Sequence, residues 1–251
     1  MSDTKLHIAD VSSLLQEDAI SDGANLSTQP RSLAPMVSKR FDNLGRDDCS
    51  RTFRLGIMGG TFDPIHIGHL ACAEQVRETF SLDGVIFMPA GDPWMKQDRY
   101  VAAAECRLDM VRLAVADNPY FDVSRLEIDR PGKTYTVDTL RELRQHFPSN
   151  VELYFISGAD AVFRILEWRD AEEVTRLAHL IAVTRPGYEI SDARRKYMRT
   201  HASILHVWQT EVTALSISST DLREKVAQGK SIRYLVPQVV ADYIYDKGLY
   251  R

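Results

Sequence analysis

The sequence lacks any long apolar run. No stretch of its 251 residues approaches the roughly 18 consecutive apolar residues that a membrane-spanning helix requires, and the N-terminus has no signal-peptide core. Hydrophobic residues make up 44% of the chain and charged residues 26%, which is typical of a soluble globular protein. We therefore expect no membrane partner, and a chain of this length allows one large domain or two small ones.

Cysteine is scarce and has no spacing typical of a metal site. The three cysteines, Cys49, Cys72 and Cys106, are odd in number and lie far apart, so they indicate neither a disulfide framework nor a zinc site. A reducing compartment suits such a chain best. We expect a cytoplasmic protein and assign no metal ligand.

The sequence also has no excess of basic residues. Its net charge of −4 gives no electrostatic case for binding nucleic acid, which would need a basic face. We therefore expect no nucleic-acid partner. Small anionic ligands remain compatible with this charge, because a local basic pocket can exist in a mildly acidic protein.

Residues 1–51 lack the sustained hydrophobic periodicity of the rest of the chain. They are rich in Ser, Asp, Asn and Pro, and a short helical pattern over Leu6–Ile20 ends at Asp22-Gly23. We expect a mostly disordered extension over residues 1–51 and a globular domain over residues 52–251. Upstream sequence wrongly assigned to the gene would have the same composition.

From Phe53 onward, predicted strands alternate with predicted helices. The expected strands are Arg54–Met58, Gly84–Met88, Phe121–Ile128, Val151–Ser157, Leu180–Thr184 and Ile204–Trp208. The expected helices are Gly68–Phe80, Ala102–Ala116, Thr136–Phe147, Ala159–Trp168, Ala171–Ala178, Ser219–Gln228 and Pro237–Lys247. This alternation predicts an α/β fold with a doubly wound parallel sheet, in which ligands bind at the carboxyl ends of the strands.

Two common nucleotide-binding patterns are missing. A dinucleotide fingerprint needs G-x-G-x-x-G after the first strand, whereas the order here is Gly56-x-x-Gly59-Gly60, which disfavours an NAD-dependent dehydrogenase. A P-loop needs a glycine five residues before its Gly-Lys-Ser/Thr triplet. The two triplets, at residues 132–134 and 229–231, have glutamate at that position.

The most informative stretch is Arg54–Leu70, which reads R-L-G-I-M-G-G-T-F-D-P-I-H-I-G-H-L. An apolar strand meets a glycine pair and an Asp-Pro turn, and then His66 and His69 fall on the first turn of a helix. Glycines allow close backbone approach, and the free N–H groups and dipole at a helix start favour negative charge. The stretch therefore predicts a phosphate-binding loop. The alternative, two histidines that only cap the helix or fill the core, leaves the glycine pair and the Asp-Pro turn unexplained.

A second phosphate-binding element is predicted near the C-terminus. Residues 216–223 read S-I-S-S-T-D-L-R, and the spacing of Ser218 and Asp221 suits a capping box at a helix start. The hydroxyl and N–H groups there can hold phosphate oxygens, and the planar guanidinium of Arg223 suits a polyphosphate. Taken alone, such a segment is more often only a helix cap.

These motifs resemble those of a known superfamily. G-G-T-F-D-P-x-H-x-G-H is similar to the nucleotidyltransferases that share H-x-G-H with class I aminoacyl-tRNA synthetases, and I-S-S-T-x-x-R looks like the adenylyltransferase element. The intervening segments resemble nicotinate-nucleotide adenylyltransferases; they are Met88–Lys96, Tyr135–Leu140, Ile156–Ala161, Trp168 and Thr184–Gly187. The resemblance covers Arg54–Arg251. It implies a Rossmann-like nucleotidyltransferase fold and transfer of AMP from ATP to nicotinic acid mononucleotide, the penultimate step of NAD synthesis.

The resemblance also implies roles for single residues. The expected catalytic residues are His66, His69 and Arg223. The expected ATP-binding residues are Gly59, Gly60, Thr61, Phe62, His66, His69, Ser218, Ser219, Thr220 and Arg223. The expected acceptor-binding residues are Lys96, Thr136, Asp160, Trp168 and Arg185, with Trp168 stacked on the pyridine ring and Asp160 near the nucleotide sugars or the metal.

Structural roles are the alternatives for several of these residues. Trp168 is equally compatible with a core position, Thr136 and Asp160 with helix caps, and Lys96 with a solvated surface position. The sequence departs from the pattern at one point: the aromatic residue that follows the stacking tryptophan in some relatives is Arg169 here.

The implied reaction needs no covalent enzyme intermediate. The phosphate of the acceptor is already ionised near pH 7, so catalysis would consist of positioning and of charge stabilisation. The expected cofactor is Mg²⁺, held mainly by phosphates and water, and the expected partners are ATP and nicotinic acid mononucleotide.

Other functions remain open. They are adenylylation of nicotinamide mononucleotide or phosphopantetheine, and a non-catalytic nucleotide-binding regulatory module. A tRNA synthetase fragment is disfavoured because no K-M-S-K-S-like loop follows. Homo-oligomerisation is left open.

Overall fold

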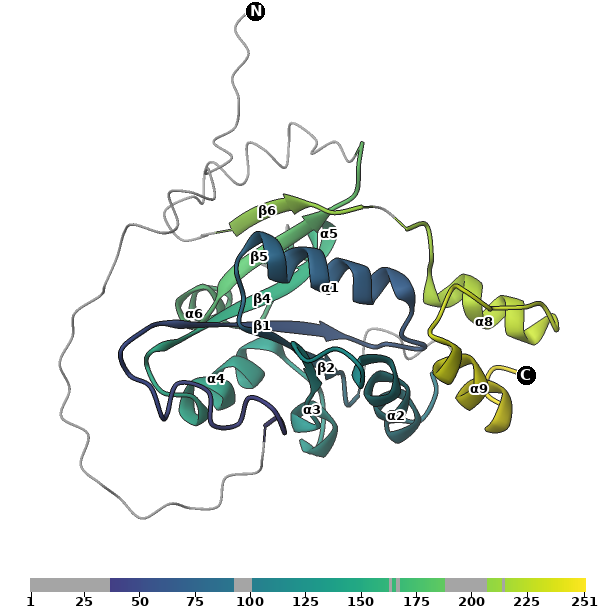
Figure 1. The fold of residues 1–251 in the computed structure, drawn as a ribbon, viewed down its shortest axis with the longest axis horizontal. Helices are drawn as coiled ribbons and strands as arrows, with labels where there is room; N and C mark the ends of the chain where they lie inside the picture. The colour runs from purple at the N-terminus through teal and green to yellow at the C-terminus, as the bar shows by residue number, and fades with distance from the viewer. Residues whose placement is uncertain (1–36, 93–100, 163, 166–167, 188–206, 214) are drawn as a thin grey trace, which may run out of the picture.

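The computed structural model describes residues 37–92, 101–162, 164–165, 168–187, 207–213 and 215–251. Within them a six-stranded parallel sheet has the order β3-β2-β1-β4-β5-β6 (Figure 1). The strands are β1 (Phe53–Gly60), β2 (Gly84–Pro89), β3 (Phe121–Val123), β4 (Val151–Gly158), β5 (His179–Thr184) and β6 (Val207–Glu211). The strand order reverses between β1 and β4, so the carboxyl ends of these two strands form the switch point where such sheets bind ligands.

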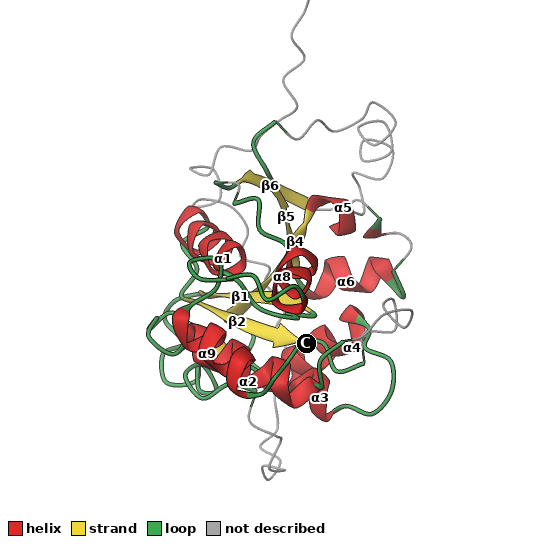
Figure 2. Ribbon diagram, turned by 90° about the vertical axis from the view of Figure 1, so that its right-hand side faces the viewer, coloured by secondary structure: helices red, strands yellow, loops and turns green. Residues whose placement is uncertain are grey.

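Helices cover both faces of the sheet, which confirms the expected doubly wound α/β architecture (Figure 2). One face carries α1 (Ile67–Thr79), α2 (Ala104–Val115), α8 (Ser219–Ala227) and α9 (Gln238–Asp246). The other carries α3 (Leu126–Asp129), α4 (Thr136–His146), α5 (Ala159–Val162) and α6 (Ala171–Leu177). Side chains along β1 point alternately to the two faces of the sheet. Leu55 and Ile57 pack in the core on the α4 face, and Met58 packs in the core on the α1 face.

Two elements differ from their sequence-based expectations. The strand expected over Phe121–Ile128 ends at Val123, because the chain turns at Ser124, whose hydroxyl accepts the N–H of Leu126 at 3.2 Å and leads into α3. In place of the long helix expected over Ala159–Trp168, α5 ends at Val162. The last strand begins at Val207, and residues 204–206 of the expected strand lie outside the described residues. No helix among the described residues is long and apolar enough to cross a membrane.

Residues 37–51 pack against the domain, which corrects the expectation that they form part of a loose extension. Val37 and Phe41 are buried in the core on the α4 face. The Asp122 carboxylate accepts hydrogen bonds from the Ser38 hydroxyl at 2.6 Å and from the Arg40 N–H at 2.7 Å. The Phe41 ring fills the space beside Gly84, where an added Cβ would lie 2.2 Å from it. The packing of residues 37–51 could not be predicted from composition, because the few apolar residues in this segment are separated by polar ones. Residues 1–36 lie outside the described residues, and the expectation for them stays a prediction.

Candidate active site

The junction of β1 and α1 is a compact turn that carries the two histidines. After Gly60 the chain passes through Phe62, whose φ is 49°, and through a cis Asp63–Pro64 peptide, and α1 then begins after its N-cap, His66. The Phe62 ring packs over Gly60, where a Cβ would lie 3.0 Å from the ring, so glycine is required for this close approach. The same ring meets His69 edge-on, with 5.1 Å between centroids. The Phe62 ring thus packs against the His69 ring and helps to hold it in place.

The His66 and His69 rings are stacked, with centroids 3.7 Å apart. The backbone N–H of His66 donates to Nδ1 of His69 at 3.3 Å, which makes Nδ1 an acceptor and leaves the proton of His69 on Nε2. Burial, with a smaller contribution from the charge of Arg185, lowers the pKa of His66 to about 4. Near pH 7 His66 is therefore a neutral imidazole that acts as a hydrogen-bonding group.

These histidines line a cavity of about 340 Å³ at the carboxyl ends of β1, β4 and β5. The other expected residues in its wall are Ser218, Ser219 and Arg185. Further lining residues, to which the sequence motifs assigned no role, come from strand ends, from α1 and from the loop before α8; they are Met58, Gly68, Cys72, Ile156, Ser157, Gly158, Val183, Val212, Thr213, Leu215 and Ile217. Because ligands bind at the switch point of such a sheet, the strand order could have indicated that these strand ends line the site, but it does not identify the single side chains. Burial raises the pKa of the Cys72 thiol to about 11, so this cysteine is a neutral part of the wall.

The N-terminus of α8 faces the same cavity as that of α1. Ser218 caps α8, and its hydroxyl accepts the N–H of Asp221 at 3.1 Å, which confirms the expected helix start. The Ser219 hydroxyl donates to the Pro64 carbonyl oxygen at 2.9 Å and ties α8 to the turn before α1. The positive dipole ends of two helices at one cavity make it suited to an anion.

Other expected ATP-binding residues do not line the cavity. Arg223 donates through Nη1 to the Asp63 carbonyl oxygen at 2.7 Å and through Nη2 to the Thr220 hydroxyl at 3.2 Å. Arg223 and Thr220 are not among the residues that line the cavity, and neither are Gly59, Gly60, Thr61 and Phe62, which form the turn. A catalytic role for Arg223 stays a prediction.

Two buried charged residues that were not expected hold this turn in place. Arg107, from α2, donates to the carbonyl oxygens of Ala102, Thr61 and Gly91 at 2.9–3.0 Å. Asp63 accepts hydrogen bonds at Oδ1 from the Tyr250 hydroxyl at 2.7 Å and from the Ala102 N–H at 3.2 Å. In the sequence, the only indication of the Arg107 contacts was the position of this arginine beside the apolar stripe of α2. No local sequence pattern indicated the hydrogen bonds of Asp63.

Most of the expected acceptor-binding residues lie outside the cavity that the histidines line. Thr136 is the first residue of α4, and Trp168 packs edge-on against Phe155 of β4, with centroids 5.8 Å apart. Asp160 is exposed in α5, directly after β4. Of the acceptor set, only Arg185 lines the cavity of the histidines, and Lys96 lies outside the described residues. The roles of all five stay predictions.

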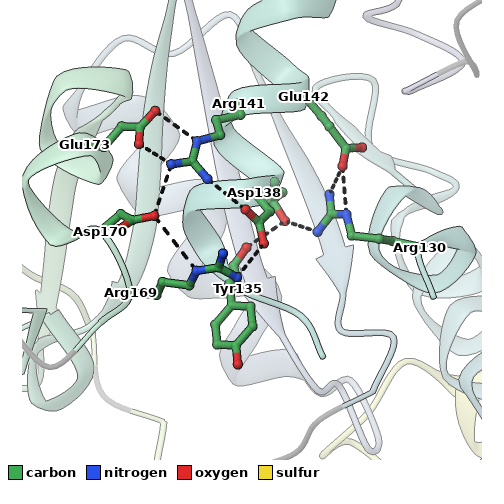
Figure 3. Close-up of polar contacts among 9 residues, drawn as sticks. Arg130, Tyr135, Asp138, Arg141, Glu142, Arg169, Asp170 and Glu173 are labelled. Atoms are coloured by element: carbon green, nitrogen blue, oxygen red, sulfur yellow. Dashed lines mark hydrogen bonds and ion pairs between the residues drawn. The ribbon is translucent and has the colours of Figure 1, made fainter. Parts of the chain in front are cut away.

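An ion-pair network links α4, which begins at Thr136, to the start of α6 (Figure 3). Arg141 of α4 bonds to Asp138 of the same helix and to Asp170 and Glu173, which lie at the start of α6. Arg169 lies over the Tyr135 ring at 5.0 Å and 3.6 Å from Asp138 Oδ2. The Arg169 guanidinium thus contacts Tyr135, the residue that precedes Thr136.

Comparisons with known proteins identify the family. A family model described as cytidylyltransferase-like matches residues 57–225. A probable nicotinate-nucleotide adenylyltransferase from Streptomyces coelicolor is 53% identical over 194 residues, which cover 77% of this chain and 99% of the relative. One from Moorella thermoacetica is 50% identical over 203 residues, which cover 80% and 94%.

Solved structures share the fold. Plasmodium falciparum nicotinic acid mononucleotide adenylyltransferase, complexed with APC in one structure and with NaAD in another, matches with a TM-score of 0.63 at 19% identity. The match covers 79% of this chain and 97% of that protein.

Proposed function

The chain belongs to the cytidylyltransferase-like family and, within it, to the nicotinate-nucleotide adenylyltransferases, and we propose that it transfers AMP from ATP to nicotinic acid mononucleotide. The products would be nicotinic acid adenine dinucleotide and pyrophosphate, in NAD synthesis. The observation that carries this proposal is the cavity at the switch point, where two helix N-termini and a pair of stacked histidines meet.

The cavity suits the triphosphate of ATP. The N-termini of α1 and α8 would receive the negative charge, and Nε2–H of His69 would donate to a phosphate oxygen. An oxygen of the acceptor phosphate attacks the α-phosphorus in line, the bond from that phosphorus to the bridging oxygen breaks, and pyrophosphate leaves. Because the attacking oxygen is already ionised, no general base is required, and the protein contributes orientation and charge stabilisation.

Mg²⁺ would enter the site with ATP. Among the described residues, no group of three or more His, Cys, Asp or Glu side chains could hold a metal ion. The wall offers imidazole, hydroxyl and backbone N–H groups, and this donor set is compatible with an ion whose ligands are phosphate oxygens and water. Bound in that way, the ion would neutralise charge on the α-phosphate and on the departing pyrophosphate.

The acceptor would bind on the other side of the switch point, beside α4. Trp168 would stack on the pyridine ring, Thr136 and Asp160 would contact the mononucleotide, and Arg185 would link this group to the cavity of the histidines. Supporting this arrangement, α1 follows β1 onto one face of the sheet and α5 follows β4 onto the other, the geometry of a switch point at which doubly wound sheets bind ligands. The expected contact of Lys96, the cytoplasmic location and the oligomeric state stay predictions from the sequence.

Pyrophosphate release tests this function. MgATP is supplied with nicotinic acid mononucleotide, nicotinamide mononucleotide or phosphopantetheine in turn. We expect the highest kcat/KM with nicotinic acid mononucleotide. A higher kcat/KM with another acceptor would identify that acceptor as the substrate. ATP binding without turnover on any acceptor would favour a regulatory module.

A further inference from the structure

We propose that Tyr250, next to the last residue of the chain, is a positioning residue for nucleotidyl transfer. Its hydroxyl fixes the Asp63 carboxylate, and Asp63 in turn sets where Arg223 and the histidine-bearing turn lie. The inference rests on the ATP site of the proposed function, in which Arg223 serves the triphosphate; only the effect on turnover rests in addition on transfer to an acceptor.

The chain end is folded back into the protein. The helix α9 ends in a turn at Gly248, whose φ is 61°, and the N–H of Leu249 donates to the Ile244 carbonyl oxygen at 3.0 Å. Tyr250 follows with a φ of 64°, a conformation that few non-glycine residues adopt. This backbone directs the side chain inward, where it is 8% exposed, and the C-terminus lies beside α9, toward the end of the sheet to which β1 points (Figure 1).

The tyrosine reaches the turn between β1 and α1. Its hydroxyl donates to Oδ1 of Asp63 at 2.7 Å, across 187 positions of sequence. Asp63 is 2% exposed, and the only other hydrogen bond to its carboxylate among the described residues comes from the Ala102 N–H, also to Oδ1. Tyr250 therefore supplies one of two donors to a buried charge, and such a charge depends strongly on each partner.

The orientation of the carboxylate decides how Arg223 is held. Nη1 of Arg223 donates to the Asp63 carbonyl oxygen at 2.7 Å, whereas Oδ2 of the same residue lies 3.7 Å from Nη1, beyond hydrogen-bond distance. Tyr250 and the Ala102 N–H hold the carboxylate by Oδ1 and keep it out of a direct bond with the guanidinium. Arg223 follows Ser218 and Ser219 by one helical turn, so its distance from the anion site depends on this contact.

Loss of the Tyr250 hydroxyl has a definite consequence. The buried carboxylate loses a donor, and the nearest cation that can replace it is Arg223. A direct ion pair would pull Arg223 toward Asp63 and lower its ability to serve a triphosphate. The variant should therefore bind and use ATP less well, while its affinity for the acceptor stays the same.

Tyr250→Phe tests the inference, because it removes one oxygen and keeps the ring. We expect the KM for ATP to rise or kcat to fall by roughly tenfold in total, the scale for a hydrogen bond to a charged group. The KM for the acceptor should stay within twofold. The matched control is Tyr245→Phe, the same change on α9. The Tyr245 hydroxyl makes no hydrogen bond to any residue that the structure describes, so this variant should behave like the unmodified enzyme. Unchanged ATP parameters in Tyr250→Phe would overturn the inference.

A double-mutant cycle separates positioning from general destabilisation. Arg223→Lys already loses the planar fork, so adding Tyr250→Phe should cause little further loss. Independent, multiplicative losses would show that Tyr250 does not act through Arg223.

The rise in melting temperature caused by MgATP is a readout that needs no acceptor. A smaller rise in Tyr250→Phe supports the inference even if the unmodified enzyme turns over no acceptor, a result that would overturn only the proposed function. An equal rise, together with equal ATP kinetics, would refute the role of Tyr250.

Discussion

The two halves of the proposed site are built by different means. On the ATP side, His66, His69 and Ser218 line one cavity, and each is placed by the N-terminus of a helix. On the acceptor side, Trp168 packs on the opposite core, and the ion pairs of Arg141 join α4, which begins at Thr136, to the start of α6. Backbone geometry thus sets the ATP side, and side-chain contacts between distant elements set the acceptor side. Changes on the ATP side should affect kcat, whereas changes on the acceptor side should affect acceptor binding.

Residues 37–51 belong to neither half and should affect only stability. Deletion of residues 1–51 removes the buried Val37 and Phe41, and we expect the free energy of unfolding to fall by about 3–5 kcal/mol, the scale for truncating a buried phenylalanine. Chemical denaturation measures this loss. Deletion of residues 1–36 alone is the control and should change neither stability nor activity. Equal stability of the two truncated proteins would show that the packing of Phe41 contributes nothing.

The ATP side should respond most strongly at His69. We expect His69→Ala to lower kcat by about 10²–10³-fold, because one donor to charge in the transition state is lost. His69→Gln, which retains an N–H donor at similar reach, should lose less. Steady-state kinetics with both substrates saturating measures the effect. Near-normal turnover in a folded His69→Ala protein would remove this residue from the mechanism.

The two halves should also differ in how pH affects stability. Burial raises the pKa of Glu127, which lies beside α4, to about 7 from its ordinary 4.5. Because the folded state then binds the extra proton, the stability from this group is complete below pH 4.5 and is lost as pH rises through about 7. His66 has a lowered pKa of about 4, so its contribution is complete above 6.5 and is lost as pH falls through about 4.

Glu127→Gln checks this difference, since glutamine mimics the protonated acid. Relative to the unmodified protein, we expect the variant to gain about 1–3 kcal/mol between pH 5 and 8, as measured by denaturation at each pH. The Thr139 hydroxyl donates to Glu127 at 2.7 Å, so Thr139→Val is a second probe that should raise the Glu127 pKa further. A pH-independent difference between Glu127→Gln and the unmodified protein would show that Glu127 does not titrate in this range.

The acceptor side should respond at Trp168. We expect Trp168→Ala to raise the KM for the mononucleotide by about tenfold through lost stacking, with little change in the KM for ATP. Trp168→Phe retains a ring and should lose less. An unchanged acceptor KM, accompanied by lower stability, would identify Trp168 as a core residue packed on Phe155.

The sequence predicted best where structure is local. The glycine pair, the Asp-Pro turn, His66 and the Ser218 cap lie next to the elements that they shape, and the alternation of strands and helices predicted the sheet. Contacts between distant segments could not be predicted in this way. Asp63 looked like a turn residue, but its carboxylate meets Tyr250 from the other end of the chain. Phe41 lay in a polar segment, and only the open space beside Gly84 explains its burial.

Transfer of a labelled phosphorus tests the central claim most directly. ATP that carries ³²P at the α-position is incubated with the enzyme, Mg²⁺ and nicotinic acid mononucleotide, and the products are separated. Attack at the α-phosphorus predicts that the label appears in nicotinic acid adenine dinucleotide and that the released pyrophosphate is unlabelled. Label in pyrophosphate, or consumption of ATP without a labelled dinucleotide, would contradict the account.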